Sequence, residues 1–231
     1  MVTAGNELKM GPLRPTRDRY AFEAPDRIVE FARKNSMLGR GHTLVWHQMQ
    51  PAWVERGSFS KAELAAILEE HIRTVVGRYK GRIGSWDVVN EAVGDDLQMR
   101  PSFWYKTMGL DYLDLAFRWA HEADPACQLF YNDCGCEGMG WKSNPVYDLV
   151  KGLKERGAPI HGVGLQAHFE LGKVPPADEI RENIRRYAKL GLAVHITELD
   201  IRIEGSPGKM DFKDQAEQYV QVLEAVAAEP N

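Results

Sequence analysis

Short runs of apolar and β-branched residues recur along the chain, and amphipathic segments fill the intervals between them. The runs cover residues 2–4, 44–46, 83–89, 129–131, 163–165 and 193–197. Runs this short and this apolar are typical of parallel strands that are buried on both faces. We therefore expect six buried strands, each followed by a segment that crosses back over the sheet.

The intervening segments have helical periodicity and recognisable ends. Ser60 and Glu63 form a capping box that opens the first of them, and Gly157 and Gly191 mark the ends of two others. The predicted apolar faces comprise Leu64, Ile67, Leu68, Ile72, Val75 and Val76, then Ile180, Ile184, Tyr187 and Ala188, and finally Tyr219, Val220, Leu223, Val226 and Ala227. Alternation of strands and helices predicts an α/β fold with a parallel sheet, either a doubly wound sheet or a barrel.

The polar residues at the strand ends favour the barrel. The glycine pair Gly39 and Gly41 precedes a strand rather than a helix, so a dinucleotide-binding loop is not indicated. Active sites of barrel enzymes are built from residues at the carboxyl ends of all strands. Polar residues gather at the end of every predicted strand: Asn6 and Lys9, His42 and His47, Asn90 and Glu91, Asn132 and Asp133, Gln166 and His168, and Glu198 and Asp200.

Two glutamates occupy closely similar settings. Glu91 ends the run Trp-Asp-Val-Val-Asn-Glu, and Glu198 follows the run Val-His-Ile-Thr. Two carboxylates at strand ends that face one cleft are the minimum apparatus for cleaving a glycosidic bond. A single glutamate at such a place is more often a cap or an ion-pair partner, so only the two glutamates together indicate a glycosidase.

Composition sets limits on the function. The chain has 231 residues with 44% hydrophobic and 27% charged content and a net charge of −4, which suits one globular domain and gives no basic surface for nucleic acid or anionic membrane. No apolar stretch approaches the roughly 20 residues of a membrane span. Residues 1–9 lack the layout of a secretory signal. The three cysteines, Cys127, Cys134 and Cys136, have no partners at zinc spacing, so we expect free thiols, no metal and no cofactor.

Five motifs follow one another along the chain. They begin at Thr3 (Thr-Ala-x-Asn-Glu-Leu-Lys), Gly41 (Gly-His-Thr-Leu-Val-Trp-His), Trp86 (Trp-Asp-Val-Val-Asn-Glu), Gly162 (Gly-Val-Gly-Leu-Gln-Ala-His) and Ile196 (Ile-Thr-Glu-Leu-Asp). Together, in this order, they resemble glycoside hydrolase family 10, the retaining endo-β-1,4-xylanases. The resemblance covers almost the whole chain and implies one partial catalytic domain over residues 1–231.

The resemblance implies roles for particular residues. Glu91 would be the acid/base and Glu198 the nucleophile of a double displacement that retains anomeric configuration. Asp200 would orient His168 beside Glu198, and Asp87 and His47 are ambiguous between structural and functional roles. The substrate-binding residues would be Asn6, Lys9, His42, Trp46, Asn90, Gln166 and His168. Trp86 and Trp119 are expected in the core.

The chain departs from the family pattern at several positions. Gly5, Met10 and Met49 stand where the family usually has glutamate, tryptophan and glutamine, and Cys134 and Gly135 stand where it has tyrosine and asparagine. We expect these changes to weaken binding of the leaving-group side. The resemblance also predicts a (β/α)8 TIM barrel whose first and eighth βα units are missing, which leaves two open sheet edges.

Several alternatives remain open from the sequence. Another retaining barrel glycosidase, a cellulase or mannanase, would use the same carboxylate pair. A metal-dependent barrel hydrolase would use His42, His47, His168 and Asp200, and a non-catalytic xylan binder would keep the sugar contacts without turnover. The leading expectation is a secreted, monomeric xylanase whose partner is xylan or a xylo-oligosaccharide.

Overall fold

The computed structural model describes residues 1–205 and 208–229, and its main feature is a six-stranded parallel sheet. The strands follow one another in space as they do in the chain, in the order β1-β2-β3-β4-β5-β7. A doubly wound sheet would reverse its order at one point, so this sequential order confirms the predicted barrel arrangement. The bounds of the strands are β1 Val2–Thr3, β2 Gly39–Val45, β3 Ser85–Asn90, β4 Gln128–Asp133, β5 Gly162–Leu165 and β7 Ala193–Ile196.

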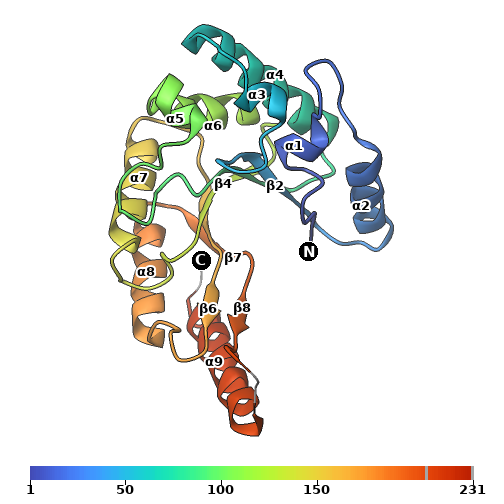
Figure 1. Cartoon of the computed structure of the whole chain (residues 1–231). Coiled ribbons are helices and arrows are strands. Elements are labelled where there is room, and N and C mark those ends of the chain that lie inside the picture. The colour runs from blue at the N-terminus through green and yellow to red at the C-terminus, as the bar shows by residue number, and fades with distance from the viewer. Residues whose placement is uncertain (206–207, 230–231) are drawn as a thin grey trace.

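The helices form an outer arc around the sheet, and the arc is open between the N-terminal strand and the C-terminal helix (Figure 1). The described chain therefore carries six βα units of a barrel, with β1 and β7 at the two edges of the sheet. The helices are α1 Met10–Leu13, α2 Glu23–Lys34, α3 Ala52–Glu55, α4 Lys61–Arg78, α5 Phe103–Met108, α6 Asp111–Ala123, α7 Ser143–Glu155, α8 Ala177–Lys189 and α9 Lys209–Ala227. Within the described ranges, the chain has no helix with the length and apolar character to cross a bilayer.

Local sequence explains where most elements begin and end. Ser60 and Glu63 form the predicted capping box at the start of α4, and Gly157 and Gly191 follow α7 and α8 with φ of 74° and 68°. Strand β2 is longer than expected because it starts at Gly39 and includes buried polar side chains. Arg40 and His42 lie inside it, and both contact the buried carboxylate of Asp87 on β3. Because these polar residues precede the apolar run, the pattern of the sequence indicated only the last two residues of the strand, Leu44 and Val45.

The predicted apolar face of the last helix is only partly correct, because Tyr219 and Val226 are half-buried against the core and the other predicted residues are exposed. Helix α9 buries Val222 and Ala225, whereas Val220 and Leu223 are about half exposed. Leu223, together with Val226 and Ala227, faces a cavity of about 640 Å³ that edge strands β1 and β7 also line. The periodic stripe therefore faces the open side of the sheet. In α8 the predicted face is correct except for Ala188, which is exposed, while Asn183 is buried beside Ile184.

A two-stranded parallel sheet lies beyond the ends of β5 and β7 and was not predicted. It pairs β6 (His168–Glu170) with β8 (Asp200–Arg202), and its register sets His168 directly opposite Asp200. Strands of three residues are too short to show a periodic pattern. The pairing brings His168 and Asp200 into contact beside the predicted nucleophile, Glu198.

His71 on α4 is a buried titratable group away from the strand ends. Its ring is fully buried, and neither nitrogen has a hydrogen-bond partner in the part of the chain that the structure describes. Burial, assisted by the nearby positive charge of Arg14, lowers the pKa of His71 to about 3. The folded protein therefore keeps this imidazole neutral at pH values where the unfolded chain, with a pKa near 6.5, binds a proton.

This difference in proton binding predicts a specific acid sensitivity. Between about pH 6.5 and pH 3 the unfolded state holds more protons, so stability falls as pH falls through that window. We expect the titration of His71 to lower the free energy of unfolding by about 3 kcal/mol between about pH 7 and pH 4. Urea unfolding of the parent and His71→Phe at both pH values measures it, because phenylalanine removes the titration. An equal acid loss in the two proteins would show that His71 is not responsible.

Candidate active site

The carboxyl ends of the strands gather the polar residues that the sequence singled out. Glu91 directly follows β3, and Glu198 lies two residues after the end of β7. Asn132 at the end of β4 and Gln166 directly after β5 lie between them in the sheet order. The side chains of Glu91 and Glu198 are 14% and 30% exposed, so both carboxylates remain accessible from the same edge of the sheet.

Three amide side chains connect the two glutamates through hydrogen bonds. Gln166 Nε2 donates to Glu91 Oε1 at 3.0 Å and to Asn90 Oδ1 at 3.2 Å. Asn132 Nδ2 donates to the same Asn90 oxygen at 2.9 Å and to Glu198 Oε1 at 2.9 Å. All three amides are buried. Because each amide is fixed by another, the network holds both carboxylates in defined positions, as a catalytic site requires.

The backbone at Glu91 adopts an uncommon conformation. Its φ is 53°, in the left-handed region that few non-glycine residues occupy. Two contacts hold it there: Glu91 N donates to Asn132 O at 2.9 Å, and Arg100 Nε donates to Glu91 O at 3.1 Å. Unusual backbone geometry of this kind clusters at functional sites, where the surrounding structure determines it.

A glycine in β5 makes room for the amide of Asn132. A Cβ atom at Gly164 would lie 2.2 Å from Asn132 Oδ1 and 2.9 Å from Thr197 Cγ2, so no larger residue fits without a shift. Thr197 Oγ1 donates to that Asn132 oxygen at 2.8 Å and so fixes which end of the amide faces Glu198. A glycine inside a strand is therefore part of how Glu198 is positioned.

His168 links the nucleophile candidate to Asp200. His168 Nε2 lies 3.2 Å from Glu198 Oε2, and Nδ1 lies 2.7 Å from Asp200 Oδ2. Burial opposes protonation of the ring, but the hydrogen bonds and charges of Asp200 and Glu198 outweigh it and raise the pKa of His168. A protonated His168 donates to both carboxylates and so places a positive charge beside Glu198.

The contact with Asp200 gives a testable shift in titration. Replacing Asp200 with asparagine removes the negative charge that most strongly favours the imidazolium, so the pKa of His168 should fall. An NMR titration of the His168 ring measures the change directly. Asp214→Asn, an exposed substitution on α9, is the matched control and should leave the titration unchanged. An unaltered pKa of His168 in Asp200→Asn would show that Asp200 does not set it.

A second polar cluster lies over β1 and β2. Lys9, His42 and Glu198 line a cavity of about 180 Å³. His42 Nδ1 contacts Asp87 Oδ2 at 3.0 Å, so Asp87, whose role the sequence left open, orients His42. Asn6 does not line this cavity; its Oδ1 accepts a hydrogen bond of 2.9 Å from Lys9 Nζ.

The aromatic and histidine residues after β2 surround the other carboxylate. Trp46 is half-buried, and Lys9 Nζ lies 4.8 Å from the centroid of its ring. His47 Nδ1 lies 3.8 Å from Glu91 Oε2. Burial and the positive charge of Arg100 lower the pKa of His47, so it faces Glu91 as a neutral ring. Trp86 and Trp119 are buried, as expected.

Sequence reasoning missed the functional contact of Asn132. The sequence marks Asn132 only as a polar residue at a strand end. That position, in a sheet that also carries Glu198, is the one feature that could have indicated their contact. All three cysteines are free thiols. Across residues 1–205 and 208–229, no three His, Cys, Asp or Glu side chains are placed to hold a metal ion.

The fold and the strand-end carboxylates together define a protein of the (β/α)8-barrel class with a glutamate pair at the carboxyl ends of its strands. The sequence profile of glycosyl hydrolase family 10 matches residues 1–231. The chain belongs to this family, as its motifs indicated.

Individual relatives agree with this assignment. The chain is 44% identical to endo-1,4-beta-xylanase B of Thermotoga neapolitana over its whole length and 47% identical to endo-1,4-beta-xylanase B of Paenibacillus barcinonensis over 87% of it. It spans only 66% and 62% of those two proteins. Xylanase 10B of Thermotoga petrophila RKU-1, solved in complex with xylobiose, is 45% identical, with a TM-score of 0.96 over 99% of this chain and 70% of that one.

Proposed function

We propose that this chain is the catalytic part of an endo-1,4-β-xylanase that hydrolyses internal bonds of xylan with retention of configuration. The observation that supports it most is the amide network that fixes Glu91 and Glu198 at one edge of a parallel sheet. Family membership and xylanase relatives favour xylan over other polymers.

In the proposed mechanism, one glutamate forms and releases the covalent bond to the sugar, and the other transfers the protons. Glu198 attacks the anomeric carbon and forms a glycosyl ester, while Glu91 protonates the departing glycosidic oxygen. Glu91 then removes a proton from water, which hydrolyses the ester. Asn90 binds the 2-hydroxyl of the reacting sugar, a hydrogen bond that strengthens as positive charge develops on the ring.

The remaining residues of the site either bind the sugars on the non-reducing side of the cleaved bond or position the groups that act on the substrate. Lys9 and His42 line the cavity beside Glu198, and Asn6 positions Lys9. Trp46 presents a ring face, and Gln166 and His168 position the two carboxylates. The mechanism needs no metal or cofactor, so activity indifferent to a chelator distinguishes it from a metal-dependent hydrolase. Secretion belongs to the same proposal because a polymeric substrate cannot enter cells, and a monomer suffices because one chain carries both carboxylates.

A substrate panel tests the proposal. Reducing-sugar release and viscosity should both change rapidly with xylan and little with cellulose or mannan, because an endo-acting enzyme cuts internal bonds. Faster action on cellulose or mannan would instead support another retaining glycosidase. Binding of xylan without any release of reducing ends would leave only a xylan-binding protein.

A further inference from the structure

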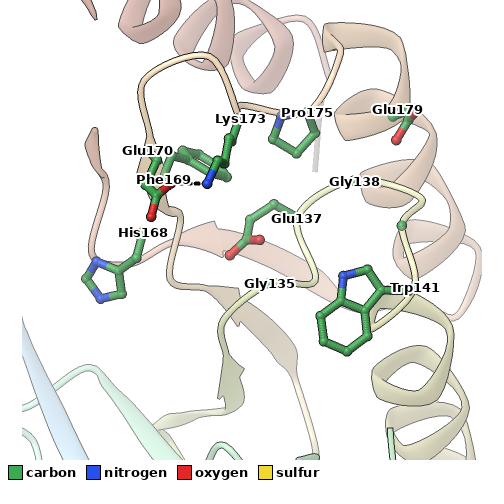
Figure 2. Close-up of a pocket in the computed structure, with 11 residues that line it drawn as sticks. Gly135, Glu137, Gly138, Trp141, His168, Phe169, Glu170, Lys173, Pro175 and Glu179 are labelled. Carbon is green, nitrogen blue, oxygen red and sulfur yellow. Dashed lines mark ion pairs between the residues drawn. The ribbon is translucent and has the colours of Figure 1, made fainter. Parts of the chain in front are cut away.

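A cavity of about 410 Å³ lies beside the carboxylate pair and has no role in the mechanism above. It separates the loop between β4 and α7 from the segment between β6 and α8, and Figure 2 shows side chains from both pointing toward it. His168 lines the cavity and also contacts Glu198 at 3.2 Å, so the cavity is continuous with the site. The cavity with Lys9 and His42 is a separate one: Glu198 lines it, its other walls come mainly from β1 and β2, and no residue that the structure describes lines both cavities.

Trp141 presents an open aromatic surface to this cavity. The residue is 60% exposed, and Figure 2 shows the indole at the cavity edge. The backbone beneath it is fixed, because the next residue, Lys142, is buried with its Nζ 2.8 Å from Asp133 Oδ1. The opposite wall also packs closely: a Cβ atom at Gly138 would lie 2.8 Å from Pro175. A large indole held exposed by a rigid loop is typical of a binding surface.

The polar groups of the cavity suit a neutral, hydroxyl-rich ligand. Glu137 is buried and accepts a hydrogen bond of 2.9 Å from Ala167 N. Glu170 forms ion pairs with both Lys173 and Arg202. These paired charges and carboxylates offer donors and acceptors to hydroxyl groups, whereas three carboxylates in the lining disfavour a phosphate or another anion.

We propose that Trp141 is the stacking platform for a xylosyl residue on the leaving-group side of the cleaved bond. This inference rests on the proposed function, which places the non-reducing sugars over Lys9 and His42. The rest of the xylan chain then extends toward Trp141. Cys134 stands where the family pattern has a tyrosine, and Trp141 supplies an aromatic face seven positions further along the same loop. Apolar sugar faces pack on such rings as other flat apolar surfaces do.

Kinetics with two substrates test the assignment. Xylohexaose reaches the cavity, whereas an aryl β-xylobioside has only its aryl group on the leaving-group side. We expect Trp141→Ala to lower kcat/KM for xylohexaose about tenfold and to leave the aryl substrate within about twofold. Trp141→Phe should keep most of the activity, and Phe31→Ala, which removes an exposed ring on α2, should change neither. Equal loss on both substrates, or none, would overturn the proposal.

A binding measurement separates this inference from the proposed function. In a Glu198→Gln background, the indole N–H resonance of Trp141, assigned by its absence in Trp141→Ala, should shift when xylohexaose is added. If this resonance shifts although the parent protein hydrolyses no xylan, the proposed function is wrong and the assignment of Trp141 as a sugar platform stands. A stationary resonance would overturn the platform, whether or not the parent is active.

Discussion

Glu198→Gln should abolish xylan hydrolysis, with a loss on the order of 10⁴-fold or more, because an amide cannot form the glycosyl ester. The substitution preserves the shape of the side chain. The carbonyl oxygen of the new amide can still accept a hydrogen bond from Asn132 Nδ2, which is 2.9 Å from Glu198 Oε1 in the parent. The fold should therefore survive, and the loss should appear in kcat rather than in the melting temperature.

The matched control is Glu204→Gln, which makes the same chemical change at an exposed residue of the same segment. It should retain parental activity. Reducing-sugar release from xylan and thermal unfolding, measured on all three proteins, separate a chemical from a structural effect. If Glu198→Gln hydrolyses xylan as fast as the parent, Glu198 is not the nucleophile and the assignment of the site is wrong.

The position of Glu198 at the end of a strand could be predicted from sequence because the relevant information is local. Glu91 and Glu198 each follow a short apolar run, and a parallel sheet brings the ends of all such runs to one edge. The sheet order and the grouping of these residues with Asn90, Gln166 and His168 are confirmed by the structure. What each residue contributes to catalysis stays a prediction.

Features that depend on strand register could not be predicted in the same way. The contact of Asn132 with Glu198 requires Asn132 to pair with Asn90 on one side and with Gly164 on the other. The contact of His168 with Asp200, which the family resemblance implied but the hydrophobic pattern did not, requires a three-residue sheet. Neither register is encoded in the hydrophobic pattern of one strand alone, because it arises only when several strands are assembled.

The face of α9 was predicted only in part for a related reason, since Tyr219 and Val226 pack against the core but Val220 and Leu223 do not. Periodicity identifies which residues share a stripe, but not which neighbour covers it. Val222 and Ala225 are buried, whereas the stripe with Val220 and Leu223 faces the open side of the sheet. Sequence pattern and burial agree along α4, whose predicted face is fully buried beside neighbouring helices, and they disagree in part at this edge.

Glu91→Ala should give a loss that depends on the leaving group. Xylan has a poor leaving group that needs protonation, so its hydrolysis should fall by about 10²–10⁴-fold. An aryl β-xylobioside with an acidic phenol needs no proton, so its first step should remain fast. Hydrolysis of the glycosyl ester should then become slow, because no base activates water. We expect a burst of phenol equal to the enzyme concentration, followed by slow turnover.

Azide provides a direct check on this interpretation. Alanine leaves space for a small anion beside the anomeric carbon, and azide attacks without giving up a proton. Added azide should therefore accelerate turnover of the aryl substrate by Glu91→Ala and yield a β-xylobiosyl azide, because two displacements retain configuration. Glu55→Ala, an exposed substitution on α3, is the control and should show neither a burst nor acceleration. An α-azide product, or equal losses on both substrates, would contradict the assignment of Glu91 as acid and base.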